Sequence, residues 1–138
     1  MPPVIGLLET SLYVDDIERS IAFYSAIFGF PVIYREEQRI CGLAVAGKQV
    51  LLLFRKGGSV QARMSPGGRI PPHDGNGSLH LALAIDKVDF PSWRGKLKEH
   101  GTEIESEVDC GNGGHSLYFR DPDGHLLELI SPGCWPVF

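Results

Sequence analysis

Two stretches of the chain repeat one pattern of apolar and polar positions. Residues 9–30 read ETSLYVDDIERSIAFYSAIFGF, and residues 80–101 read HLALAIDKVDFPSWRGKLKEHG. Each stretch begins with an apolar run, passes an Asp, and continues as an amphipathic segment that ends at Gly. When the two are aligned, Glu9 falls on His80. A later run, QVLLLF, falls in the same way on HLLELI. The order of elements therefore predicts a duplicated module.

The first copy predicts one strand, one helix and three further strands. Alternating Leu, Val and Tyr side chains favour a strand over 6–14. Asp15 and Asp16 offer an N-cap for the helix, and Gly29 is placed to end it. Apolar residues recur at helical spacing between them. The three strands that follow are expected near 30–36, 39–46 and 49–55.

The second copy predicts the same order. After a strand at 79–85, Asp89 is a candidate N-cap, Pro91 suits the first helical turn, and Gly101 closes the helix. The sequence Asp-Pro-Asp-Gly before His125 is typical of a tight turn between strands, and His125 directly after it is expected to be exposed. The three strands are expected near 103–107, 114–120 and 125–131.

These elements predict an α+β fold made of two tandem βαβββ modules. Each module would form a mostly antiparallel sheet with a helix on one face, and two curled sheets could enclose a concave hollow. We expect a single domain, 1–138. Its parts are module one at about 6–55, a Gly- and Pro-rich linker or lid at about 56–78, module two at about 79–132, and a short tail, 133–138.

Composition and charge narrow the classes of partner. The 138 residues include 13 basic and 17 acidic side chains, and the basic ones are scattered, so a nucleic-acid partner is not expected. No apolar run approaches the roughly 20 residues that span a bilayer, and the N-terminus does not resemble a signal peptide. Three widely spaced cysteines suggest neither a disulfide framework nor a metal motif, and Cys41 is expected in the core. We expect a cytoplasmic protein without a membrane partner.

The chain resembles the vicinal-oxygen-chelate superfamily, which includes glyoxalases, bleomycin-resistance proteins and extradiol dioxygenases. The residues that carry the resemblance are LETSLYVDDIERSIAFYSAIFGF, the junction IPPHDGNGSLHLALAI and the ending YFRDPDGHLLELISP. The ending is the most specific of the three. The resemblance extends over about residues 6–132, which is nearly the whole chain.

The resemblance implies a site for one divalent metal ion, such as Zn, Ni, Mn or Fe. In this superfamily the ligands lie on the first and last strands of each module. Those positions correspond here to Glu9, His80 and Glu128, while the fourth position is Leu52, which cannot bind a metal. The set is thus similar to that of three-ligand members, although those usually carry His at the position of Glu9. The resemblance also implies a homodimer, in which a site can be completed by residues of both chains.

The chemistry of the three residues agrees with a metal site. Glu9 and Glu128 lie within apolar strands, where a charge is costly unless it is paired or bound to a metal. Two carboxylates and a neutral imidazole balance the charge of a divalent ion. Taken singly, either Glu could face solvent and His80 could be an ordinary strand residue; the equivalence of Glu9 and His80 in the two copies favours the metal site.

The function implied is that of a metal-dependent lyase or isomerase of the glyoxalase type. A small substrate with vicinal oxygens would chelate the metal, which would stabilise an enolate or alkoxide. Glu128 or Glu9 is the candidate catalytic base. The alternatives are a thiol transferase or dioxygenase on the same scaffold, or a non-catalytic binding protein of the bleomycin-resistance kind. A dioxygenase would favour two His and one carboxylate.

Candidate substrate contacts lie on the strand before the last turn. His115, Tyr118 and Arg120 are the predicted substrate-binding residues, and alternation along a strand puts Ser116 and Tyr118 on one face. His73 is a candidate for a closing loop.

Overall fold

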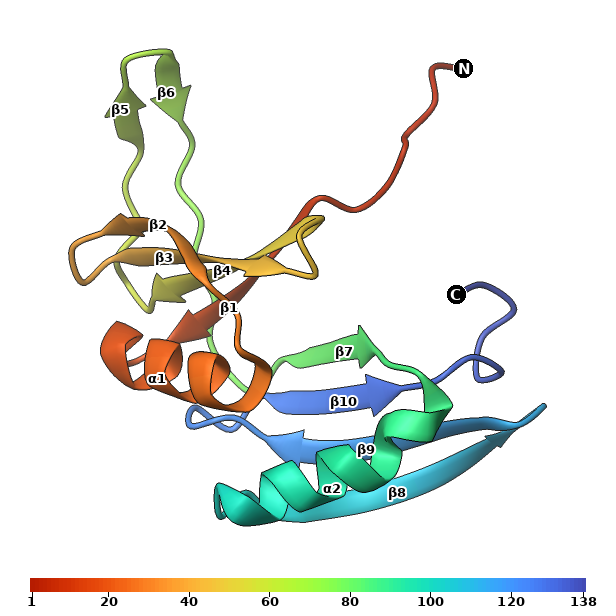
Figure 1. The fold of residues 1–138 in the computed structure, drawn as a ribbon. Coiled ribbons are helices and arrows are strands. Elements are labelled where there is room, and N and C mark those ends of the chain that lie inside the picture. Colours follow the sequence, from red (N-terminus) through yellow and green to blue (C-terminus); the bar gives the residue numbers. More distant parts are fainter. The chain divides into compact units, whose positions relative to one another are not determined.

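Both halves of the chain fold in the predicted order of elements. The computed structural model describes residues 1–138, which separate into two units, Met1–Asn76 and Gly77–Phe138. Each unit contains a four-stranded sheet and an α-helix (Figure 1). The α+β class and the two βαβββ modules are confirmed. The concave hollow stays a prediction.

The first unit contains module one. Its sheet has the strand order β1-β4-β3-β2, in which β1 pairs with β4 in parallel and the other neighbours are antiparallel. The register places Glu9 opposite Val50 and Leu52 opposite Gly42. The elements are β1 (Glu9–Val14), α1 (Ile17–Phe28), β2 (Val32–Glu36), β3 (Ile40–Val45) and β4 (Gln49–Arg55).

Helix α1 begins and ends at the predicted caps. The Asp16 side chain accepts a hydrogen bond from the Arg19 backbone N–H at 3.1 Å. Gly29 ends the helix at a φ of 68°, a conformation that costs glycine little. The helix packs against one face of the sheet (Figure 1), which fills that face with apolar side chains and buries Cys41 as expected.

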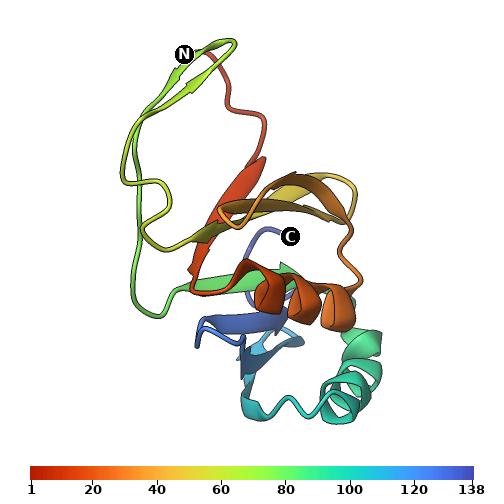
Figure 2. The same ribbon diagram turned by 90° about the vertical axis from the view of Figure 1, so that its left-hand side faces the viewer.

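The segment predicted as a linker or lid contains a short hairpin. Strands β5 (Arg63–Ser65) and β6 (Gly68–Ile70) pair with each other and extend away from the four-stranded sheet, as the yellow-green hairpin at the top of Figure 2 shows. These strands have three residues each, too few to establish alternation, so the sequence does not predict them.

The second unit contains module two, whose sheet repeats the topology of the first. The strand order is β7-β10-β9-β8, again with one parallel pair, β7 with β10. The register places His80 opposite Leu126 and Glu128 opposite Tyr118. The elements are β7 (His80–Ala84), a 3-10 turn η1 (Lys87–Asp89), α2 (Phe90–Glu99), β8 (Ile104–Gly111), β9 (Gly114–Arg120) and β10 (Leu126–Ile130).

One prediction about module two is confirmed and another is wrong. Asp89 is the N-cap residue of α2, as predicted, although its side chain makes no capping hydrogen bond. His125 is fully buried instead of exposed, since its Nδ1 accepts a hydrogen bond from the Leu79 backbone N–H at 3.0 Å. The turn itself forms as predicted, with Asp121 accepting from two backbone N–H groups.

The cysteine prediction also needs a correction. Cys110 and Cys134 form a disulfide with a Cα–Cα distance of 4.9 Å. The bond joins the end of β8 to the segment after β10. The two residues are 24 positions apart in sequence, and only the fold brings them together.

Candidate active site

Glu128 is a nearly buried carboxylate at the centre of β10. Its residue is only 7 % exposed. On β10, Leu127 and Leu129 pair with Phe119 and Leu117, which lie on the same face of β9 as His115, the residue that contacts Phe90 of α2. Alternation therefore turns Glu128 to the opposite face. There it lies beside two hydroxyl groups of β9. Ser116 Oγ donates to Glu128 Oε1 at 2.5 Å, and the Tyr118 hydroxyl donates to the same oxygen at 2.9 Å.

His80 approaches the other oxygen of the same carboxylate. Its Nε2 lies 3.1 Å from Glu128 Oε2, and its Nδ1 lies 3.0 Å from the Leu126 backbone oxygen. A carbonyl oxygen can only accept, so Nδ1 carries the hydrogen. In the neutral ring Nε2 then presents a lone pair towards a carboxylate oxygen. A cation between them, either a proton or a metal ion, can bind the lone pair of His80 Nε2 and that of Glu128 Oε2 together.

The partial burial of Tyr118 favours its neutral form. Partial removal from water, reinforced by its hydrogen bond to Glu128, raises the pKa of the Tyr118 phenol above its ordinary value. The hydroxyl, which is protonated at neutral pH even at its ordinary pKa, donates to the carboxylate.

The three predicted substrate contacts lie in different places. Tyr118 belongs to the Glu128 cluster. Arg120 makes an ion pair with Glu105 through two contacts of 2.7 and 3.0 Å. His115 lies on the other face of β9, with its ring edge-on to Phe90 of α2 at 4.7 Å between centroids. The structure thus brings only Tyr118 together with the predicted metal ligands.

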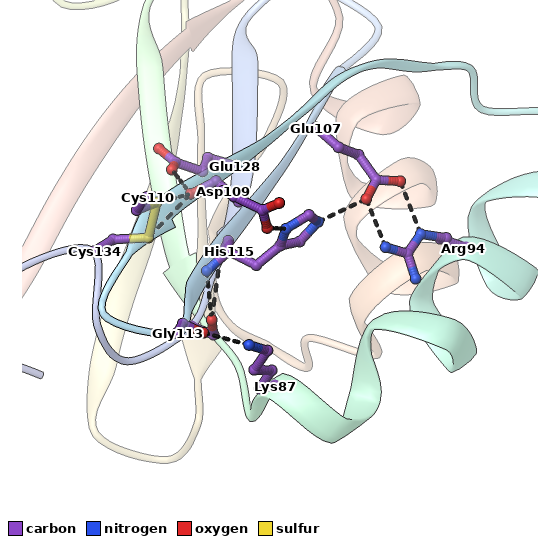
Figure 3. Close-up of polar contacts among 11 residues, drawn as sticks. Lys87, Arg94, Glu107, Asp109, Cys110, Gly113, His115, Glu128 and Cys134 are labelled. Carbon is purple, nitrogen blue, oxygen red and sulfur yellow. Dashed lines mark hydrogen bonds and ion pairs between the residues drawn. A yellow bond between two sulfur atoms is a disulfide. The ribbon is translucent and has the colours of Figure 1, made fainter.

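His115 is part of a separate charged cluster, which Figure 3 shows. Its Nδ1 lies 2.7 Å from Asp109, and its Nε2 lies 2.7 Å from Glu107, which also pairs with Arg94. The two carboxylates, Asp109 first, raise the pKa of His115. The hydrogen bond from Arg94 is the main reason that the pKa of Glu107 falls to about 2.

Glu9 lines a cavity in the first unit. The cavity of about 570 Å³ lies over the face of the module-one sheet that α1 leaves uncovered. Apolar groups line much of it, and Glu9, Arg39, Arg63 and His73 add polar ones. The apolar lining residues are Ile40, Leu52, Phe54, Ile70, Pro71 and Pro72.

The segment between β4 and β7 is tied over this cavity by polar contacts. The Tyr13 hydroxyl and His73 Nδ1 are 2.9 Å apart, and Arg39 donates to Ser59 at 2.9 Å. Arg63 makes an ion pair with Glu36. Gly75 passes so close to Tyr13 that a Cβ at this position would lie 2.3 Å from the ring. His73 therefore lines the cavity, and its role in a closing loop stays a prediction.

Neither unit gathers a complete metal-ligand set by itself. No group of three His, Cys, Asp or Glu side chains arranged for a metal ion occurs. The second unit joins two predicted ligands, His80 and Glu128, and the first unit holds Glu9 on the wall of its cavity. The contact of Ser116 with Glu128 was not predicted, although strand alternation had placed Ser116 on the face of Tyr118.

No helix of the chain combines the length and apolarity required to cross a membrane.

Comparison with protein families gives one match that covers most of the chain. Residues 6–129 match the model of the Glyoxalase/Bleomycin resistance protein/Dioxygenase superfamily. A lactoylglutathione lyase of Salmonella typhimurium is 26 % identical over an alignment of 134 residues, and the match covers 90 % of each protein. A catechol-2,3-dioxygenase of Bacillus subtilis is 30 % identical over 125 residues, but the chain spans only 39 % of the length of that protein.

Solved structures of related proteins have the same fold. The crystal structure of a lactoylglutathione lyase from Agrobacterium tumefaciens superposes with a TM-score of 0.88 at 29 % identity, covering 98 % of this chain and 99 % of that one. A mutant of the fosfomycin resistance protein FosX from Listeria monocytogenes, complexed with Mn(II) and a dihydroxypropylphosphonic acid, gives a TM-score of 0.67 at 26 % identity. That superposition covers 92 % of this chain and 90 % of that one.

Proposed function

Because the chain belongs to the glyoxalase/bleomycin resistance protein/dioxygenase superfamily, we propose that it is a divalent-metal-dependent enzyme of the glyoxalase type. It would act as a lyase or isomerase on a small substrate with adjacent oxygen atoms. The ion would be Zn, Ni, Mn or Fe, with His80 and Glu128 as two ligands and Glu9 as the predicted third. When bound, such an ion acts as a Lewis acid that stabilises negative charge developing on the substrate.

The observation that carries this proposal is the arrangement of His80. Metal-binding histidines typically donate their second ring N–H to a backbone carbonyl, which fixes the orientation of the ring. His80 does so through Nδ1 and Leu126, and this leaves Nε2 facing Glu128 Oε2. Ser116 and Tyr118 occupy only Oε1, so Oε2 stays directed at the imidazole. The donor set therefore fits a divalent ion.

The other residues suggest how the reaction would proceed. Both carboxylate oxygens of Glu128 already have partners, since Ser116 and Tyr118 donate to Oε1 and His80 faces Oε2. Glu9 lies on the wall of the apolar cavity, where a bound substrate would be adjacent to its carboxylate. We therefore favour Glu9 as the group that takes up the substrate proton. Phe54 and Leu52 would exclude water from the apolar part of the substrate.

The first experiment is elemental analysis of protein purified without chelators. We expect about one equivalent of one transition metal per chain, which His80→Ala and Glu128→Gln abolish. His100→Ala, which changes an exposed histidine of the same unit, should keep the metal. Glu9→Gln tests the third ligand. A wild-type protein that folds stably but contains no metal, and takes up none on reconstitution, would exclude the metal-enzyme proposal and favour a binding protein.

A thiol transferase or dioxygenase activity is the second candidate. Leu52 at the position of a fourth ligand favours a three-ligand centre, and the relatives named above include a fosfomycin resistance protein and a catechol dioxygenase. The metal-loaded protein can be incubated with lactoylglutathione, with fosfomycin and a thiol, and with catechol. Conversion of only one of these compounds would identify the reaction class.

The homodimer implied by the resemblance also remains a proposal. Large apolar side chains of the N-terminal segment are exposed, which supports burial against a second chain. These residues are Val4, Ile5, Leu7 and Leu8.

A further inference from the structure

The Cys110–Cys134 disulfide lies against the hydroxyl group that holds Glu128. Ser116 Oγ is 3.6 Å from the sulfur of Cys110 and 3.8 Å from that of Cys134. Ser116 is fully buried and donates to Glu128. A continuous series of contacts therefore runs from both sulfurs, through one hydroxyl, to the carboxylate. Figure 3 shows the disulfide and Glu128 in the same close-up.

The disulfide is also the covalent tie of the C-terminal tail. Ser131 is held by hydrogen bonds with the backbone of His115, but these end at Ser131. Beyond it, Cys134 is anchored to the end of β8. The tail lies directly on the start of β9, since a Cβ on Gly114 would lie 2.4 Å from the Cys134 nitrogen. The tail thus helps to keep water away from Ser116.

We propose that the Cys110–Cys134 disulfide is a redox-sensitive modification site that controls the metal-binding carboxylate of Glu128. The proposal rests on the proposed metal function. A dithiol reductant would attack the sulfur of Cys110, which belongs to an exposed residue, and form a mixed disulfide. Its second thiol would then release the protein. Cys110 and Cys134 take up two electrons and two protons, and the reductant becomes a disulfide.

Reduction would act on the site through Ser116. Residues 132–138 lose their covalent tie while Ser131 stays in place, so water reaches the Ser116 hydroxyl. A hydrogen bond to a buried carboxylate weakens when water competes for it, and the half-buried Tyr118 hydroxyl then remains as the other donor to Glu128. Disulfides in reducing compartments are mostly transient or redox-sensing, and exposed ones are the labile kind.

The test compares two states of the full-length protein. The oxidised protein should contain one free thiol, that of Cys41, and the protein treated with a phosphine reductant should contain three. After removal of the reductant without air, Mn²⁺ affinity is measured by calorimetry. We expect reduction to weaken it about tenfold, the range seen when a ligand loses an outer partner. Cys110→Ser and Cys134→Ser should both show the reduced-state affinity and no response to reductant.

Two results would overturn the proposal. One is an oxidised protein that still has three thiols, and the other is an equal Mn²⁺ affinity in both states. If neither state binds Mn²⁺, the proposed metal function fails. The coupling of the disulfide to Ser116 can then be tested without metal, by backbone hydrogen exchange. Faster exchange over 114–118 on reduction supports the coupling of the disulfide to Ser116, whereas unchanged protection there contradicts it.

Discussion

Module one and module two share their strand order and pairing registers, but equivalent positions carry different chemistry. The uncovered face of module two gathers a carboxylate and two hydroxyls, and that of module one is largely apolar and borders a cavity. In the two registers, Glu9 corresponds to His80, Leu52 to Glu128, Gly42 to Tyr118 and Ile40 to Ser116.

The small residue in module one explains part of the difference. Gly42 lies opposite Leu52, and a Cβ there would already be 3.3 Å from Tyr34 and 3.6 Å from Leu52. A side chain of the size of Tyr118 at this position would press against Tyr34 and Leu52, both of which line the cavity. A duplicated fold can therefore provide a polar cluster in one copy and space for an organic molecule in the other. This division supports the proposal that module two supplies two of the three ligands, His80 and Glu128, and that the cavity of module one takes the organic substrate.

The largest effect on Mn²⁺ affinity should come from replacing Glu128 of module two with the residue at the equivalent position of module one. Glu128→Leu copies Leu52 and removes a proposed ligand. We expect Mn²⁺ affinity to fall by more than the roughly hundredfold loss seen for outer partners of a ligand. Leu52→Met, which keeps the equivalent position apolar, should change it little. Retention of wild-type affinity by Glu128→Leu would show that the carboxylate does not bind the ion.

A smaller loss of Mn²⁺ affinity is expected when the Glu128 carboxylate stays and only one of its hydrogen-bond donors is removed. Tyr118→Phe removes one of the two hydroxyl donors of Glu128 Oε1 and leaves the Ser116 bond. We expect Mn²⁺ affinity to fall about tenfold. The free energy of unfolding without metal should change by about 1 kcal/mol. Calorimetry and urea titration measure the two effects, and an affinity loss as large as that of Glu128→Leu would contradict a supporting role.

The smallest effect concerns the other face of module two. The pKa of His115 is raised above its ordinary value of 6.5, so its contribution to stability is complete below that pH and is lost as pH rises through the folded-state value. The pKa of Glu107 is lowered from 4.5 to about 2, so its contribution is present above 4.5 and lost as pH falls towards 2. Stability from this cluster should therefore be greatest between these two ordinary values.

His115→Gln tests this pH dependence. Urea unfolding at a series of pH values should show that the variant loses the decline above pH 6.5. The loss of stability towards acidic pH should remain, since the hydrogen bond from Arg94 is the main cause of the lowered pKa of Glu107. His100→Gln is the matched control and should follow the wild type. An unchanged alkaline decline in His115→Gln would assign it to another group.

Local patterns in the sequence predicted most of the elements and part of the site. Alternation and caps placed the strands of both modules and the ends of α1, because these signals lie within a few residues of one another. The repeat also made Glu9 and His80 equivalent, as the registers now confirm. The same alternation, applied strictly, would have separated His115 from Tyr118, which lie on opposite faces of β9.

Contacts between distant segments could not be predicted in this way. Of the two cysteines of the disulfide, Cys110 lies at an irregularity of pairing between Asp109 and Gly111, and Cys134 lies in the tail after β10. The burial of His125 depends on the backbone N–H of Leu79, 46 positions earlier. Nothing near either residue in the sequence indicates these partners.

In each module the first strand pairs in parallel with the last strand of the four, and this pairing has a consequence for biosynthesis. In module two, β7 has no partner until β10 has been made, and the two residues that meet across this pair, His80 and Glu128, are 48 positions apart. Contacts of such long sequence separation form late, since a large loop must close first. A nascent chain therefore cannot bring His80 and Glu128 together until β10 has been made, so the proposed ion site would form only after all the strands of module two are available.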